Sequence, residues 1–102
     1  MAKASKSASP SKSAASPIRV GNPVFIRTVT HHYTGKIVGV TKDEILLVKA
    51  AWIASDGRFA QALASGVFDE VEPYPPALVV SIGRGAVIDV VTWGHALPST
   101  VK

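Results

Sequence analysis

Residues 24–48 read VFIRTVTHHYTGKIVGVTKDEILLV, and this stretch decides the fold. β-Branched and aromatic residues dominate it, and such residues favour strands. His31 and His32 are expected at a turn or a strand edge, and the polar run 41–44 predicts a second turn. Gly35 and Gly39 indicate a bulge or a strong bend in the middle segment. The stretch and the residues just after it therefore predict three short, bent strands, at residues 24–30, at 33–40, and from 45 to about 51 or 52.

The next part of the chain predicts one short helix and then a loop. Residues 59–64 favour a helix, with Ser55 or Asp56 as its N-cap and Gly66 just past its end. Residues 69–76 combine three acidic residues with three prolines, which indicates a loop and not a central strand.

Two further β-rich segments, 77–82 and 86–92, complete the domain. Together these elements predict a mainly β fold: a small five-stranded, strongly bent barrel of the SH3 or Sm-like kind, with one short helix between its third and fourth strands. We expect the barrel domain to span residues 18–98, and residues 99–102 to form a short C-terminal end.

The first 17 residues have a different composition. They contain no Val, Ile, Leu, Phe, Tyr or Trp, so they cannot bury enough apolar surface to offset the entropy of ordering. After residue 19 the chain has seven basic and seven acidic residues, so the net charge of +4 belongs to Lys3, Lys6, Lys12 and Arg19. The sequence predicts a disordered, basic tail that contacts nucleic acid or an acidic partner.

Composition also excludes several classes of protein. The chain has no cysteine, which rules out disulfides and thiolate metal sites. No apolar run approaches the roughly 18 residues needed to cross a bilayer, and the N-terminus lacks the apolar segment of a secretion signal. We therefore expect no membrane partner. The acid-free N-terminus is similar to an organelle transit peptide, but arginine is scarce there and an amphipathic face is missing.

No catalytic or metal-binding pattern stands out. His31 and His32 are adjacent, so on a strand they would point to opposite faces and could not easily share an ion. Asp69, Glu70 and Glu72 form the only acidic cluster. We interpret it as a solvated loop or a contact for a neighbour's basic tail; a divalent-cation site or a catalytic pair is the alternative. No Ser-His-Asp arrangement or nucleophile elbow is present, so we expect no enzyme activity and no cofactor.

A few residues remain as candidate contacts with a partner. Gly83-Arg84-Gly85 predicts a tight turn, and Arg84 could there meet a phosphate or a carboxylate. Trp52, Trp93 and Tyr74 are either core residues or interface anchors, because Trp and Tyr concentrate at interfaces. A domain of this size leaves much of its surface unburied, so we expect a homo-oligomer or a larger protein shell as partner.

Two short motifs resemble those of the Sm-like barrels. Residues 35–40 (GKIVGV) resemble the first motif, and residues 84–88 (RGAVI) resemble the second. The resemblance implies a small barrel that binds nucleic acid. The turn aspartate of the family falls here on Thr41, its base-contacting asparagine on Ile45, and the apolar residue before Arg-Gly on Gly83, which implies that the base-reading pocket is missing.

A second resemblance covers more of the domain. Residues 24–28, 33–35, 50–54, 57–59 and 88–89 resemble small uncharacterised proteins encoded in tailed-phage genomes. That resemblance implies a capsid decoration or connector protein located in the virion or the host cytoplasm. We therefore expect a non-enzymatic assembly protein whose basic arm reaches a neighbour or nucleic acid. The alternative is an Sm-like nucleic-acid-binding module.

Overall fold

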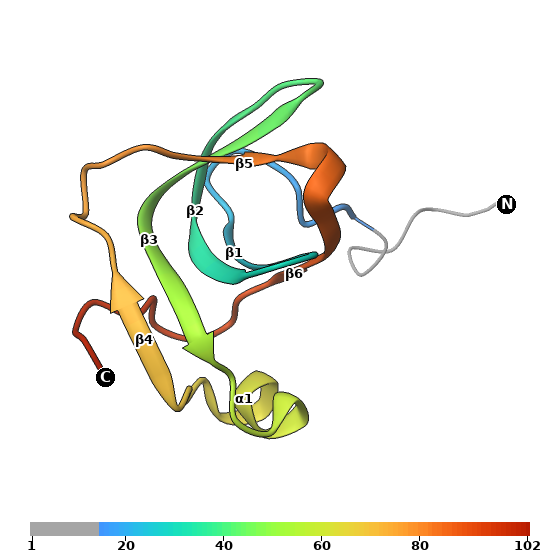
Figure 1. The fold of residues 1–102 in the computed structure, drawn as a ribbon. Coiled ribbons are helices and arrows are strands. Elements are labelled where there is room, and N and C mark those ends of the chain that lie inside the picture. The colour runs from blue at the N-terminus through green and yellow to red at the C-terminus, as the bar shows by residue number, and fades with distance from the viewer. Residues whose placement is uncertain (1–14) are drawn as a thin grey trace, which may run out of the picture.

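The computed structural model describes residues 15–102 (Figure 1). Lys3, Lys6 and Lys12, and most of the predicted tail, lie outside the described residues. The elements of the described part are β1 (Pro23–Thr28), β2 (His32–Val40), β3 (Glu44–Ser55), α1 (Phe59–Ser65), β4 (Glu70–Pro73), β5 (Val80–Gly83), the 3-10 turn η2 (Arg84–Ala86) and β6 (Val87–Thr92). None of its helices is long and apolar enough to cross a membrane.

The strands form one antiparallel sheet in the order β4-β3-β2-β1-β6, and β5 also pairs with β3. This confirms a mainly β fold with one short helix between β3 and β4. The predicted five-stranded barrel is wrong, because the sheet has six strands and does not close. Figure 1 shows the strands curling around a common centre, but β6 pairs only with β1 among the described strands.

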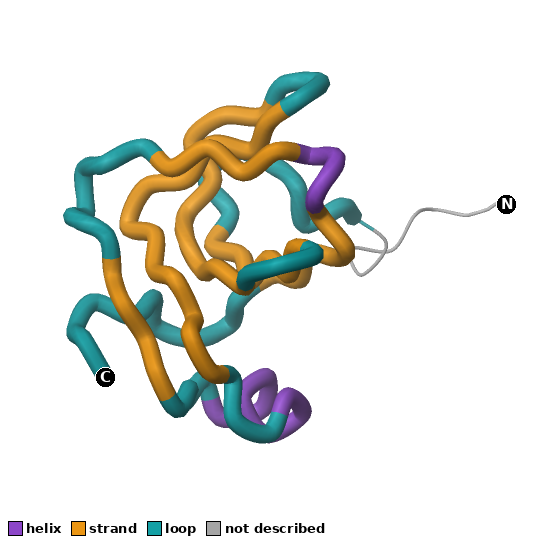
Figure 2. The backbone as a smooth tube through the Cα atoms, viewed as in Figure 1, coloured by secondary structure: helices purple, strands orange, loops and turns teal. Residues whose placement is uncertain are grey.

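The long third strand explains the difference. β3 has twelve residues, and its two halves pair with different strands along the same edge: residues 44–47 with β5 and residues 51–55 with β4. Between the halves, Lys49 has a left-handed backbone (φ 51°), which bends the strand. β3 therefore takes part in three pairings, with β2 along one edge and with β5 and then β4 along the other (Figure 2), and β4 is the additional strand.

The β4 strand corrects the prediction of a loop over residues 69–76. Val71 is the only buried residue of β4 and lies between the exposed Glu70 and Glu72. The sequence of this segment therefore carried only a weak indication of a strand. Pro73 pairs with Ala51 at the end of an edge strand, a position that tolerates proline. Ordered pairing also extends past Pro98, because Lys102 exchanges two backbone hydrogen bonds with Val71.

The two ends of α1 differ in how well they were predicted. Ser55 and Asp56 do not cap the helix: Ser55 ends β3, and the N-cap is Arg58, which makes no side-chain capping bond. Gly66 ends the helix in the left-handed conformation, as expected. A Cβ at Gly66 would lie 2.5 Å from the ring of His95, so this position also needs glycine for space.

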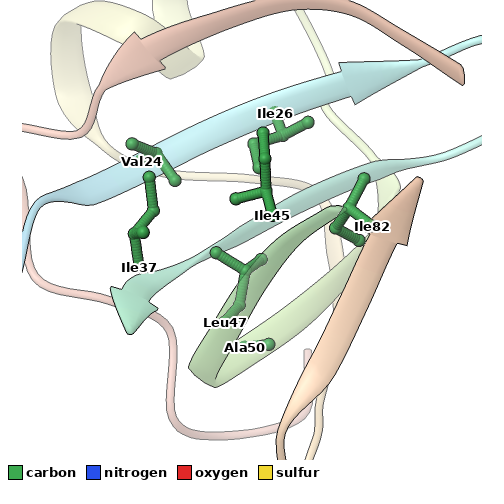
Figure 3. Packing of buried hydrophobic residues seen from close by; sticks show 7 residues of the cluster. All are labelled: Val24, Ile26, Ile37, Ile45, Leu47, Ala50 and Ile82. Atoms are coloured by element: carbon green, nitrogen blue, oxygen red, sulfur yellow. The ribbon is translucent and has the colours of Figure 1, made fainter. Parts of the chain in front are cut away.

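The sheet has two hydrophobic cores, one on each face. The first lies inside the curl of the sheet and under β5, where its side chains converge (Figure 3): Val24, Ile26, Ile37, Ile45, Leu47, Ala50 and Ile82. The second lies between the other face and α1: Phe25, Ala51, Ile53, Ala62, Phe68, Val71 and Trp93. Successive residues of β1 alternate between the two, so β1 is buried on both sides.

The predicted bends in β2 are present. The pairing of β2 with β3 shifts between Thr34 and Lys36 and again between Ile37 and Gly39. Gly35 and Gly39 thus lie at the two irregularities, where the strand turns around the first core.

Candidate assembly surface

The outer side of β6 is an open sheet edge. Trp93 donates its amide to the carbonyl of Pro23 at 2.8 Å, just past the end of the β1–β6 ladder. Because hydrogen bonding alternates along an antiparallel strand, the amides of Val91 and Asp89 then face β1, and those of Thr92 and Val90 face outward. Within residues 15–102, no strand pairs with this side. We call it the β6 edge.

The composition of β6 suits strand pairing. Five of its six residues, all except Asp89, are β-branched. The Asp89 carboxylate accepts hydrogen bonds from Arg27, with 2.9 Å between Nε and Oδ1, and these bonds lower the pKa of Asp89. Arg27 also lies over the ring of Phe59, 4.7 Å from its centroid. The single charge of the strand is therefore paired with Arg27 of the same chain, at the partly exposed surface, and does not protect the edge.

The opposite edge, at β4, is protected in several ways. Natural sheets guard their edges with charges, prolines and short strands. β4 has four residues, ends at Pro73, and carries Glu70 and Glu72. Val71 and Lys102 exchange backbone hydrogen bonds of 3.0 Å, so the C-terminal residue covers the middle of this strand. β5, of four residues, likewise pairs only with β3 among the described strands, so β6 is the longer of the two strands that keep an open side.

Exposed apolar side chains flank the β6 edge at one end. Ile88 is 58% exposed, and it is the extra residue where the β1–β6 pairing shifts. Val29, 70% exposed, donates its amide to Ala86 at 3.0 Å and so lies beside the start of the strand. This end of the edge can bury apolar surface against a partner.

The two tryptophans have different places. Trp93 is 2% exposed and stacks on Phe68 with 5.1 Å between ring centroids, so it is a core residue and is not available as an interface anchor. Trp52 lies within β3 and remains 37% exposed. Its ring meets the ring of His31 edge-on at 5.6 Å. Tyr74 is half-buried and packs against the first core. Tyr33 packs against the same core, and its burial, with a smaller effect of the nearby Tyr74, raises the pKa of Tyr33.

Of the predicted basic contacts, Arg19 and Arg84 belong to the described residues; both are exposed and donate hydrogen bonds to backbone carbonyls. Arg19 donates to the carbonyl of Ser16 at 2.9 Å. Arg84 donates to the carbonyl of Thr41, also at 2.9 Å, and its amide bonds to Asp43, so it braces the turn between β2 and β3. Neither interaction requires a phosphate.

The acidic cluster lies on the exposed side of β4 and just before it. Asp69, Glu70 and Glu72 are exposed and form no ion pair with any described residue. In the part of the chain that the structure covers, no group of three His, Cys, Asp or Glu side chains is placed to hold a metal ion.

One polar site was missed by sequence reasoning. His32 Nδ1 lies 2.8 Å from Asp56 Oδ2, and the ring of His32 meets Phe25 edge-on at 5.7 Å. An open pocket of about 330 Å³ adjoins the pair, and Asp56 Oδ1 is buried without a partner among the described residues. The carboxylate of Asp56 can hold the imidazole ring of His32 in one orientation. The one hydroxyl in the pocket lining, that of Thr30, bonds to His31 and not to His32. Asp56 is 24 positions from His32, so only the β2–β3 pairing brings them together.

No protein-family model, curated protein or solved structure matches this chain.

Proposed function

We propose that this protein is a non-enzymatic structural protein that assembles through the β6 edge, with copies of itself or on a larger shell. The observation that carries the proposal is the contrast between the protected β4 edge and the open β6 edge. Adding a strand to a free edge supplies backbone hydrogen bonds without a preformed pocket. A β-branched strand whose one charge is neutralised by Arg27 is well suited to this.

The setting we propose is a phage particle, as a capsid decoration or connector protein. The resemblance of residues 24–28 and 50–54 to small tailed-phage proteins supports it. The basic residues Lys3, Lys6, Lys12 and Arg19 would then contact a neighbouring subunit or packaged nucleic acid.

The charge distribution favours one second candidate, a nucleic-acid-binding module. All of the net charge of +4 precedes residue 20, and electrostatic binding to phosphates is steeply salt-dependent. In that case affinity for DNA or RNA falls with salt and disappears when residues 1–17 are removed. Assembly through the β6 edge, in contrast, persists at high salt and without those residues.

The test is the mass of the native assembly by analytical ultracentrifugation, at low and high salt. Ile88→Lys places a charge on the β6 edge at an exposed position, so it should disrupt assembly without unfolding the protein. Val38→Lys is the matched control, because Val38 is also exposed but lies on β2, which has a neighbour on both sides. A monomer under every condition, or an Ile88→Lys protein that assembles like the wild type, contradicts the proposal.

A further inference from the structure

The side of the sheet that faces away from α1 carries a row of two aromatic side chains and a carboxylate. Tyr33 of β2 lies opposite Trp52 of β3, and Trp52 lies opposite Glu72 of β4. Residues directly opposite each other on neighbouring strands share one face of the sheet, and their side chains are neighbours. We call this row, Tyr33, Trp52 and Glu72, the Trp52 face.

The Trp52 face is open to a ligand. Ala51 and Ile53, the neighbours of Trp52 along β3, are buried in the second core beside α1, so Trp52 points to the opposite side of the sheet. There its side chain stays 37% exposed, and Glu72 is exposed as well. The exposed ring of His31 meets the indole edge-on at 5.6 Å. The face therefore offers an aromatic surface beside a carboxylate.

The charge of the Trp52 face is negative. The strand segments that form it, residues 32–35, 51–55 and 70–73, contain no lysine or arginine, and their acidic residues are Glu70 and Glu72. Both glutamates are exposed, and neither forms an ion pair with a described residue.

An aromatic ring beside a carboxylate suits a cationic side chain. The face of a Trp ring attracts a cation more strongly than that of Tyr or Phe, and the carboxylate pairs with the same cation. The protein contains one such arrangement already, in which Arg27 lies 4.7 Å from the ring centroid of Phe59 and donates hydrogen bonds to Asp89. The strands of the Trp52 face supply the ring and the carboxylate, so the cation has to come from another segment.

The N-terminal arm is the cationic segment of this chain. Residues 1–14 lie outside the described residues; they have no acidic residue and three basic ones, Lys3, Lys6 and Lys12. We propose that this arm docks on the Trp52 face of its own chain, with a lysine ammonium over the indole ring of Trp52 and paired with Glu72. Docking of this kind reduces the charge on both surfaces and occupies the lysines while the protein is free.

The place where the arm enters the domain supports docking within one molecule. Ile18 packs against the first core, as Tyr33 does, so the chain enters on the side of the sheet that carries the Trp52 face. Gly21 donates its amide to the carbonyl of Ile37 at 2.7 Å, and Tyr33 lies four residues before Ile37 on β2, about 13 Å along the strand. Lys12 precedes Gly21 by nine residues, which can span up to about 30 Å. All three lysines can therefore reach this face.

Covalent linkage favours the arm of the same chain over other occupants. A segment tethered by a short stretch of chain has an effective concentration in the millimolar range, so weak contacts suffice for docking. A neighbouring subunit or a nucleic acid then has to displace the arm from the Trp52 face before it can bind the same lysines. A phosphate backbone does not suit the face itself, because Glu70 and Glu72 repel it.

The test uses the full chain with a nitroxide spin label in the arm. The protein has no cysteine, so Ser9→Cys gives a single attachment site between Lys6 and Lys12. The readout is the NMR signals of the two indole N–H groups. Trp93 is buried on the other side of the sheet, but its amide bonds to Pro23, close to where the arm enters. An arm that is not docked should therefore broaden the Trp93 signal at least as strongly as the other indole signal.

We expect the label to broaden the Trp52 signal much more strongly than the Trp93 signal at low salt. At about 1 M salt, where the screening length falls to about 3 Å, the difference should disappear. Glu72→Gln should lower the equilibrium constant for docking about two- to fivefold, which is the contribution of one exposed ion pair. Asp43→Asn is the matched control, because it removes an exposed carboxylate from the turn between β2 and β3 and should leave the constant unchanged. Equal urea midpoints confirm that the variants fold.

Three outcomes would overturn the inference: equal broadening of the two indole signals, a difference that persists at high salt, or a Glu72→Gln protein that docks as the wild type does. A mixture of isotope-labelled protein without the spin label and spin-labelled protein without the isotope tests the source of the arm. Broadening of the Trp52 signal in that mixture comes from a neighbour's arm and overturns docking within the chain.

The inference is independent of assembly through the β6 edge. Ile88→Lys changes that edge and leaves the Trp52 face intact, so the broadening of the Trp52 signal should be the same as in the wild type. A failure of arm docking and a failure of the proposed assembly are therefore seen separately, the first by NMR and the second by the mass of the assembly.

Discussion

Gly35 provides the sharpest test of how the sheet bends around its first core. A Cβ at Gly35 would lie 3.0 Å from Leu47 Cδ1, 3.1 Å from Leu47 Cβ and 3.4 Å from Ala50 Cα. Leu47 is completely buried, and neither its Cβ nor the Ala50 backbone can move away by a side-chain rotation. Gly35→Ala therefore forces the two strands apart at the bend.

Gly39 is the matched control on the same strand. A Cβ there would meet Leu46 Cδ1 at 3.0 Å, but Leu46 Cβ and Cγ at 3.5 Å, which is ordinary contact. Leu46 is only half-buried, so its far end can rotate away. Both glycines have backbone angles that alanine tolerates, so the two substitutions differ only in the available space.

The magnitudes follow from this difference. Overpacking a core costs about 1–3 kcal/mol, and replacing glycine recovers about 0.4–1 kcal/mol through the unfolded chain. We expect Gly35→Ala to lose about 1–2 kcal/mol of unfolding free energy. Gly39→Ala should stay within about 0.5 kcal/mol of the wild type, because the entropic gain offsets a small steric cost. In a domain of this size each kcal/mol shifts Tm by about 4–8 °C.

The assay is urea unfolding followed by the fluorescence of the buried Trp93, with thermal unfolding as a second measurement. The slope with urea should be the same for both variants, because each exposes the same surface on unfolding. The reasoning is refuted if Gly35→Ala is as stable as Gly39→Ala. That result would mean that the two strands separate at the bend without cost.

Three further predictions concern a core residue, an ion pair and the bend of β3. Trp93→Ala should cost about 3–5 kcal/mol of unfolding free energy, and Trp52→Ala much less, because only Trp93 is buried; chemical denaturation of both measures the difference. Hydrogen bonding by Arg27 lowers the pKa of Asp89, so its stabilising contribution is complete above the unfolded pKa of about 3.9 and is lost as pH falls through the lower folded value. Asp89→Asn should therefore show a shallower loss of stability than the wild type in a pH titration below about pH 4. Lys49→Gly should raise the unfolding free energy by about 0.5–1 kcal/mol, because the left-handed backbone strains lysine, and a lower urea midpoint would contradict this.

The β1, β2 and α1 elements were predictable because their signals are local. The β-branched run 24–30 and the bends at Gly35 and Gly39 depend on neighbouring residues in the chain. Gly66 ends α1 for a reason that is equally local, a left-handed backbone that glycine adopts without strain. The N-cap was not predictable, since Asp56 is recruited by His32 from the preceding hairpin.

The number of strands and the openness of the sheet were not predictable in this way. β4 has one buried residue and a proline, so its identity as a strand comes from pairing with β3 and not from its own composition. The barrel prediction failed because β6 pairs only with β1 among the described strands, while β3 pairs with β5 and then with β4 along one edge. No short-range pattern reports where a long strand changes partners.

The sequence by itself determined the β-rich class, the basic character of the first residues and the local positions of bends and helix end. Each of these follows from composition or from neighbours within a few residues. Only the tertiary structure decided which edge of the sheet is open, since Asp89 is a guarding charge until Arg27, 62 residues away, neutralises it. It also decided that Trp93 is a core residue, because its neighbours Phe25 and Phe68 come from segments that meet only when the chain folds.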